Sequence, residues 1–145
     1  MHIQQVSIGD DLLDICRQMQ PDNWAADNEM TSFQPERLRK FLDAGGLLFL
    51  AWENDRIAGS ALCYEMLHPA GEDTLYVHEL DTHPDFRRQG VGTTLMEYLF
   101  EVARKRDLSE VWLGADNDNP AANALYNKLN PSEVDPTITY SYKVQ

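Results

Sequence analysis

The segment Arg87–Gly92, with the sequence Arg-Arg-Gln-Gly-Val-Gly, combines a glycine turn with two guanidinium groups. It follows an extended, β-like run from Leu75 to Thr82 and precedes an amphipathic stretch from Thr93 to about Arg106. Glycine lets the backbone approach a ligand closely, and the unpaired N–H groups and dipole of a helix N-terminus attract anions. The sequence therefore predicts either a phosphate-binding turn or an ordinary structural turn between a strand and a helix.

A second group of reactive side chains comprises His78, Glu79, Asp81 and His83, which are residue types that bind metals. In a strand, however, successive side chains point to opposite faces, so His78 would point away from Glu79 and Asp81. We therefore expect no metal, and we interpret His78 as a core or site-lining imidazole. Other nucleotide-binding patterns fail, because neither Gly-x-Gly-x-x-Gly nor Gly-Lys-Ser/Thr occurs in the chain.

Composition excludes several classes of function. The 145 residues carry a formal net charge of −12, which argues against nucleic-acid binding and is compatible with a cationic ligand. No apolar run is long enough to span a membrane, and the N-terminus lacks the basic and apolar regions of a signal peptide, so we expect a cytoplasmic protein. Cys16 and Cys63 lie far apart in apolar stretches and are interpreted as buried thiols rather than a catalytic nucleophile.

The elements that position these residues alternate in type and indicate one mixed α/β domain over residues 1–145. Strands are expected at His2–Val6, Leu47–Glu53, Arg56–Leu67, Leu75–Thr82, Glu110–Gly114 and Thr137–Val144. Helices are expected from Asp10 or Asp11 to about Gln20, from Pro35 to near Gly45, from Thr93 to about Arg106, and from Pro120 to near Leu129. The expected architecture is a mixed central sheet of about six or seven strands flanked by about four helices.

Two motifs resemble those of the Gcn5-related N-acetyltransferase (GNAT) superfamily. Arg87, Gly90 and Gly92 match the signature Gln/Arg-x-x-Gly-x-Gly/Ala. About thirty residues further on, Asn119–Tyr126 matches the family element Asn-x-x-Ala-x-x-Leu-Tyr, and the two motifs lie in the expected order on the expected elements. The resemblance implies a GNAT fold and an acetyl-coenzyme A-dependent acyltransferase.

The resemblance also implies how acetyl-coenzyme A would be held. Backbone N–H groups of the glycine turn would bind the pyrophosphate, Arg87 and Arg88 would add charge near the phosphates, and the end of the central strand would pair with the pantetheine arm. Asn119 would contact that arm, cap the following helix, or do both. The residues of the turn are Gln89, Gly90, Val91, Gly92 and Thr93, and those of the strand are Leu80, Asp81 and Thr82.

The implied chemistry is direct attack of an amine on a thioester, which needs a base for the ammonium and an acid for the departing sulfur. Tyr126 matches the family tyrosine that serves as the general acid, the alternative being a ring that only packs. Glu79 is the first choice of base, because a carboxylate on an interior strand is costly unless it is paired or functional. Asp116 is the second candidate, as a base or as a ligand of the acceptor. The alternative role for Glu79 is an ion pair, and the alternative for Asp116 is a residue of a solvated turn.

Within the superfamily, the chain is most similar to the small aminoglycoside 3-N-acetyltransferases, through Arg87–Gly90, Ala115–Asp116, Ala124–Tyr126 and Lys128–Leu129. An acidic cleft would suit a polycationic acceptor, because each ammonium group could pair with a carboxylate. Other acceptors remain open: a polyamine, another small amine or a protein amine. A non-catalytic acetyl-coenzyme A sensor and a homodimer remain open as well. The residues expected to line the acceptor site are Asp22, Trp24, Asp27, Glu29, Asp116, Asp118, Glu133 and Asp135.

The sequence departs from the family pattern after Leu129. The family usually continues with Gly-Phe, whereas this chain has Asn130 and Pro131. Asparagine can adopt the left-handed conformation that glycine would supply, so the turn can be kept. Proline removes the aromatic side chain, so the family pattern does not define the geometry of the last hairpin in this chain.

Overall fold

The computed structural model describes residues 1–20, 24 and 32–145. These residues form two compact units, Met1–Gly114 and Ala115–Gln145, and each unit is described by itself. The assignment of residues 1–145 to a single domain stays a prediction.

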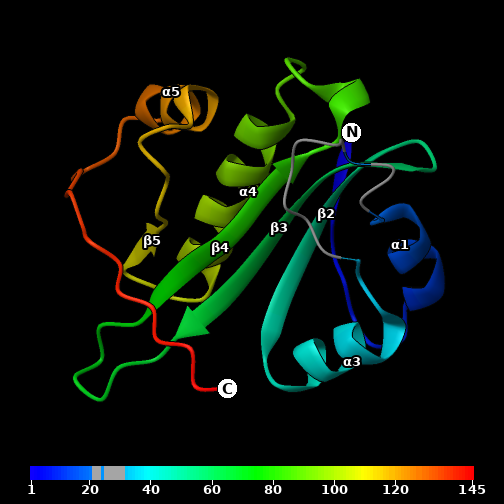
Figure 1. Cartoon of the computed structure of the whole chain (residues 1–145), viewed down its shortest axis with the longest axis horizontal. Coiled ribbons are helices and arrows are strands. Elements are labelled where there is room, and N and C mark those ends of the chain that lie inside the picture. The colour runs from blue at the N-terminus through cyan, green and yellow to red at the C-terminus, as the bar shows by residue number, and fades with distance from the viewer. Residues whose placement is uncertain (21–23, 25–31) are drawn as a thin grey trace. The chain divides into compact units, whose positions relative to one another are not determined.

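The first unit is built on a five-stranded sheet with the strands in sequence order, β1-β2-β3-β4-β5 (Figure 1). The first four strands pair antiparallel, and β5 pairs parallel to β4. The predicted α/β class is confirmed. The strands are β1 (His2–Gln5), β2 (Gly46–Glu53), β3 (Arg56–Met66), β4 (Thr74–Thr82) and β5 (Glu110–Trp112).

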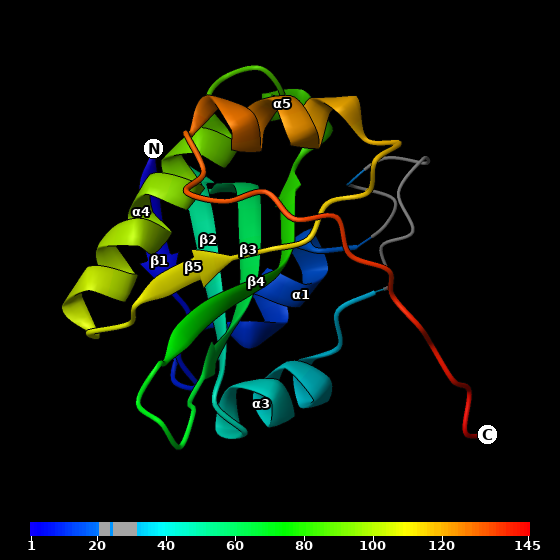
Figure 2. The ribbon, with the colours of Figure 1, turned by 90° about the vertical axis from the view of Figure 1, so that its left-hand side faces the viewer.

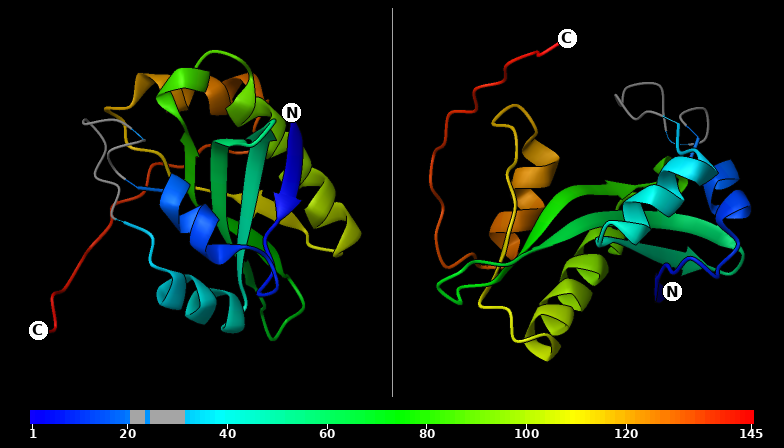
Figure 3. Two further views of the ribbon diagram at one scale, coloured as in Figure 1. Left: turned by 90° about the vertical axis from the view of Figure 1, so that its right-hand side faces the viewer. Right: turned by 90° about the horizontal axis from the view of Figure 1, so that it is seen from below.

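Helices cover both faces of this sheet. Helices α1 (Leu12–Gln18) and α3 (Pro35–Asp43) lie on one face, and α4 (Val91–Lys105) lies on the other (Figure 3). Helix α1 begins at Asp11, whose carboxylate accepts a hydrogen bond from the Asp14 N–H at 3.1 Å and satisfies one unpaired donor of the first turn. Helix α3 begins with Pro35, which has no N–H to leave unpaired there.

The apolar pattern of α4 explains why it forms and how it docks. Val91, Leu95 and Leu99 recur on one helical face, and all three side chains are buried. Burial of a leucine side chain contributes about 1.5–3 kcal/mol, so this face holds the helix on the sheet. The first turn comes closest at Gly59 of β3, where an added Cβ would lie 2.5 Å from Cγ1 of Val91. Glycine at this position therefore lets the N-terminus of α4 approach the end of β4.

The second unit contains helix α5 (Pro120–Lys128), whose first turn is capped by the Asn119 side chain. The predicted strand Thr137–Val144 is wrong: no strand forms there, and its apolar side chains, such as Tyr142 at 82% exposure, face outward. A strand is stable only when its backbone groups pair with a neighbour, and this segment pairs with none of the described residues. The described sheet consequently has five strands instead of the expected six or seven.

The remaining predicted elements are confirmed, with boundaries that differ by a few residues. Helix α4 begins at Val91, two residues before the predicted start, because the glycine turn itself closes the first helical turn. In the described parts of the chain, no helix is long and apolar enough to cross a membrane.

Candidate functional site

Strand β4 loses one of its two neighbours after the first three of its nine residues. Strand β5 pairs with it only from Thr74 to Tyr76 (Figure 2). On its other side, β4 stays paired with β3 up to Thr82. Among the described residues, no strand therefore pairs with the β5 side of β4 beyond Tyr76. An edge of this kind offers backbone donors and acceptors to an extended ligand.

A β-bulge lies at the point where β4 and β5 part. Leu62 of β3 pairs with Glu79 and the next residue, Cys63, pairs with Val77, so His78 has no partner on β3. A bulge of this type bends the strand and re-aims the side chains that follow it. The residues Leu80, Asp81 and Thr82, predicted to pair with the pantetheine arm, lie on the stretch beyond the bulge.

The glycine turn at the start of α4 has the backbone of an anion site. Arg88 and Gly90 both adopt left-handed conformations, with φ of 62° and 79°. The N-cap Gly90 has no side chain that could accept from the first N–H groups, and the first turn carries no acidic residue. The positive end of α4 is thus neither capped by a side chain at Gly90 nor neutralised by an acidic residue of its first turn. Such a helix end favours a negatively charged ligand. The N–H groups predicted to bind the pyrophosphate, from Gln89 to Thr93, belong to this turn.

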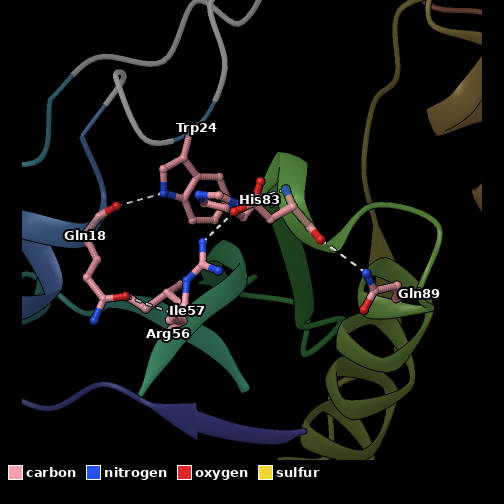
Figure 4. A network of polar contacts seen from close by, with 7 residues as sticks. Gln18, Trp24, Arg56, Ile57, His83 and Gln89 are labelled. Carbon is pink, nitrogen blue, oxygen red and sulfur yellow. Dashed lines mark hydrogen bonds and ion pairs between the residues drawn. The ribbon is translucent and has the colours of Figure 1, made fainter. Parts of the chain in front are cut away.

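A network of polar contacts holds the turn in place (Figure 4). The Asp85 carboxylate pairs with the Arg56 guanidinium at 2.7 Å, and the Asp85 carbonyl accepts a hydrogen bond from the Gln89 amide at 3.2 Å. Gln18 of α1 accepts hydrogen bonds from the Ile57 N–H at 2.8 Å and, through its carbonyl, from the indole N–H of Trp24 at 2.9 Å. The short 3₁₀ helix Pro84–Phe86 is therefore tied to β3 on one side and to the glycine turn on the other.

The buried imidazole of His83 joins this network at the end of β4. Its Nδ1 accepts a hydrogen bond from the Asp85 N–H at 3.1 Å, and its ring contacts Trp24 edge-on at 5.5 Å. Burial lowers the pKa of His83, the Asp85 carboxylate opposes this, and Arg56 and Arg87 add to the lowering. The ring is therefore neutral with its proton on Nε2, and it acts here as a structural acceptor.

Glu79 and Asp81 share one face of the sheet, because they are two residues apart on a strand. This is the face covered by α1 and α3, since Glu79 pairs in register with Leu62 and Leu62 with Leu48, a member of the core beneath those helices. Burial raises the pKa of Asp81, and the neighbouring charge of Glu79 raises it further. Glu79 itself is exposed. The two carboxylates form an acidic pair at the bend of β4, within reach of a cationic group.

The side-chain carboxylate of Asp81 is the feature that sequence reasoning missed, since only its backbone was expected to bind a ligand. The signal was present as the two-residue spacing from Glu79, which places both side chains on one face. His78 was expected to be a core or site-lining imidazole, and it is not in the core. Its ring is exposed, in contact with Tyr64 and Tyr76 at centroid distances of 5.9 and 5.6 Å.

Thiol and metal chemistry find no support among the described residues. Cys16 and Cys63 are both free and buried, as predicted. Burial raises the pKa of Cys63 to about 12, so its thiolate is scarce at neutral pH. Within the described ranges, no group of three or more His, Cys, Asp or Glu side chains is arranged to hold a metal ion.

The second unit carries three further candidates. Asn119 caps α5 through its Oδ1, which accepts from the Ala122 N–H at 3.1 Å. Asp116 is exposed and accepts from the Asp118 N–H at 3.1 Å, so these two aspartates form a compact turn. Tyr126 lies half-buried on α5. The roles expected for these residues towards acetyl-coenzyme A and the acceptor stay predictions.

The expected acceptor wall is only partly described. Asp22, Asp27 and Glu29 lie outside the described residues. Glu133 and Asp135 are exposed in the second unit. Trp24 is only 1% exposed, and what the structure shows for it is core packing with a hydrogen bond to Gln18 rather than a surface facing solvent.

The sequence of the chain is matched by the model of a known family. The model of the acetyltransferase (GNAT) family matches residues 10–130. The chain belongs to the GNAT family. This is a family of acetyltransferases that generally use acetyl-coenzyme A.

Among curated relatives, the chain is 35% identical over 96 residues to the ribosomal protein bS18-alanine N-acetyltransferase of Escherichia coli, covering 66% of this chain and 60% of the relative. It is 31% identical over 81 residues to N-alpha-acetyltransferase 30 of Schizosaccharomyces pombe, covering 56% of this chain and 54% of the relative. The matches thus span little more than half the length of these relatives.

Solved structures share the fold at lower sequence identity. An aminoglycoside acetyltransferase from an uncultured soil metagenomic sample, in complex with sisomicin, superposes with a TM-score of 0.85 at 18% identity over 99% of this chain and 96% of that chain. A ribosomal-protein-alanine N-acetyltransferase from Brucella melitensis superposes with a TM-score of 0.74 at 16% identity over 98% and 100% of the two chains. Both likenesses concern the fold alone.

Replacement of Gly90 by alanine tests the glycine turn. The left-handed backbone at φ 79° costs a non-glycine residue roughly 1–2 kcal/mol, and relief of that strain would re-aim the N–H groups of the turn. We expect G90A to lose about that much stability and to bind acetyl-coenzyme A at least about tenfold more weakly by calorimetry.

Gly71 provides the matched control, because it has a φ of 85° and, like Gly90, no atom within 4 Å of an added Cβ. We expect G71A to lose similar stability in denaturant unfolding while its affinity for acetyl-coenzyme A stays unchanged. Equal affinities of G90A and G71A would contradict a ligand-binding role of the turn.

The opposite pKa shifts of Asp81 and Asp85 predict opposite effects of amide substitution on stability. The folded state raises the pKa of Asp81, so its ionised form is a cost at neutral pH, and D81N should be more stable than the wild type there. This advantage should shrink as the pH falls from the raised pKa towards 3.8 and vanish below it.

The hydrogen bond from Arg56 lowers the pKa of Asp85, so D85N should be less stable than the wild type at neutral pH. That loss should disappear as the pH falls through the lowered pKa. Urea unfolding of both variants between pH 3 and pH 7 checks the signs, and effects of the same sign would refute the assignment.

Proposed function

We propose that this chain transfers the acetyl group of acetyl-coenzyme A to a primary amine of a polycationic small molecule, with the 3-amino group of an aminoglycoside as the favoured acceptor. The observation that carries the proposal is the acidic pair Glu79 and Asp81 at the bend of β4, in the same unit as the open β4 edge and the uncapped start of α4. In this proposal, the first unit holds the anionic cofactor at the start of α4 and the cationic acceptor at Glu79 and Asp81.

Acetyl-coenzyme A would be held by two kinds of backbone contact. The N–H groups from Gln89 to Thr93 would bind its pyrophosphate, with Arg87 and Arg88 adding positive charge. The edge of β4 from Leu80 to Thr82 would pair with the amides of the pantetheine arm, as an added strand would. Asn119 is a further contact in this proposal, since an amide that caps a helix still presents its NH₂ group.

In the proposed reaction, Glu79 takes a proton from the acceptor ammonium, and the freed amine attacks the thioester carbonyl carbon. A C–N bond forms and the C–S bond breaks, so the sulfur leaves with the electron pair. Tyr126 donates its phenolic proton to that sulfur, and the excess proton on the new amide nitrogen returns to the tyrosine oxygen. Asp116 is the alternative base, or it binds an ammonium group of the acceptor.

The charge of the chain supports a cationic acceptor. The net charge of −12 attracts polycations, and the carboxylates Asp116, Asp118, Glu133 and Asp135 of the second unit are exposed and available to ammonium groups in the proposal. Asp22, Asp27 and Glu29, which lie outside the described residues, complete the proposed set, whereas the buried Trp24 is left out of it. The aminoglycoside acetyltransferase with sisomicin shares the fold, which makes this substrate class compatible with the architecture.

A second candidate acceptor is the α-amino group of a protein or peptide. It is favoured by one observation: two of the curated relatives, at 35% and 31% identity, carry names that specify alanine N-acetylation of a ribosomal protein and N-alpha-acetylation. An N-terminal peptide presents a single amine on an extended backbone, whereas an aminoglycoside presents several amines on sugar rings.

A panel of amines separates these candidates. Thiol release from acetyl-coenzyme A is measured with gentamicin, sisomicin, neamine, spermidine and an alanine-starting peptide, and we expect turnover with the aminoglycosides. Turnover with the peptide alone would move the function to α-amino acetylation. Binding of acetyl-coenzyme A with no turnover on any acceptor would favour the non-catalytic sensor.

The assignment of the base is tested with the acceptor that is turned over. We expect E79Q to lower kcat/KM by about 10²–10⁴-fold, the usual contribution of a general base, with the largest loss below the pKa of the amine. D116N should mainly raise the KM of the acceptor. E72Q, which alters an exposed glutamate in the loop before β4, is the control. A pure KM effect in E79Q would overturn the role given to Glu79.

A further inference from the structure

An aromatic surface lies beside the acidic pair, on the same face of the sheet. Tyr64 of β3 pairs in register with Tyr76 of β4, and Tyr76 stacks against Trp112 of β5 with ring centroids 4.4 Å apart and an interplanar angle of 32°. The ring of His78 contacts both tyrosines, and its Nδ1 lies 3.3 Å from the Tyr76 hydroxyl. We call Tyr64, Tyr76, His78 and Trp112 the aromatic surface.

The aromatic surface remains accessible. Tyr64 is 39% exposed and Trp112 is 40% exposed, although both are large side chains on a sheet. On this face, α3 packs against Tyr64 through Phe41, with ring centroids 5.5 Å apart, and the rings of β4 and β5 extend beyond that contact. Exposed tryptophan and tyrosine rings side by side are a typical binding surface, since each ring presents a large area at little entropic cost.

Geometry and charge together specify what this surface binds. Aromatic faces attract cations through their quadrupole, and tryptophan and tyrosine are the strongest of these partners. Tyr76 and Glu79 pair in register with Tyr64 and Leu62 of β3, which are two residues apart, so the bulge brings them to a separation of roughly 7 Å along the sheet. A neutral apolar partner would leave the carboxylates of Glu79 and Asp81 without a counter-charge, so a cationic occupant fits better.

From this arrangement we infer that the aromatic surface binds a second cationic group of the acceptor by cation–π contacts, while the amine to be acetylated lies at Glu79. The inference rests on the proposed function, and it specifies that function further: the acceptor carries at least two cationic groups separated by roughly 7 Å. The aromatic surface then selects a polyamine or aminoglycoside over a monoamine.

The test measures binding in the presence of coenzyme A, without turnover. Calorimetry compares neamine with trehalose, a disaccharide of similar size that carries no positive charge. We expect only neamine to bind, W112L to weaken its binding about tenfold, and W112F to keep the affinity within about threefold because a ring is retained.

Tyr98 is the matched control, because it is an aromatic residue 37% exposed on α4, on the opposite face of the sheet. Y98L should leave neamine binding unchanged, and thermal melting should show that the variants remain folded. Equal losses in W112F and W112L, equal losses in Y98L and W112L, or failure of the wild type to bind neamine would each overturn the inference. Neamine that binds at Trp112 but is never acetylated would refute the proposed function and leave standing only the cation–π contact on the aromatic surface.

Discussion

The arrangement of the first unit depends on how the hydrogen bonds of β4 are distributed. Backbone N–H and C=O groups must find partners, and β4 has them on both sides only as far as Tyr76. From there the bulge at His78 bends the strand and β5 ends, so no strand of the described residues pairs with that edge. The close approach of α4 at Gly59 then brings a positive helix end to the same end of β4. The proposed binding of acetyl-coenzyme A uses both features.

Support for the glycine turn comes from residues distant in sequence. Arg56 pairs with Asp85, Asp85 holds Gln89, and the neutral ring of His83 accepts from the Asp85 N–H. The exposed ion pair contributes little stability by itself, since solvent screens such pairs. Its effect is geometric: it ties Asp85 to β3, and Asp85 in turn accepts from Gln89, next to the left-handed residues Arg88 and Gly90.

Much of this fold could be predicted from the sequence, because its elements carry strong periodic signals. The alternation in β4, the helical spacing of Leu95 and Leu99, and the proline and asparagine at the start of α5 each have one dominant interpretation. The strand predicted at Thr137–Val144 does not form. Alternating apolar and polar residues indicate only that a segment can pair as a strand, whereas pairing also needs a neighbouring strand. The bulge at His78 could not be predicted from the sequence of β4 alone, because a bulge is a property of the register between two strands. The burial of Trp24 likewise follows from tertiary packing around His83, which no local pattern contains.

Fold likeness alone cannot choose the acceptor, because an aminoglycoside acetyltransferase and a ribosomal-protein-alanine acetyltransferase both superpose on this chain. In the proposed function, selectivity comes from side chains on the face that holds Glu79 and Asp81. A monoamine would use only the carboxylates and would leave the rings of Tyr64 and Trp112 in contact with water. A polycation uses both, and each cationic group bound away from the reacting nitrogen helps to hold that nitrogen in place. The pairing of rings with carboxylates on one sheet face is thus the physical argument for a polycationic acceptor.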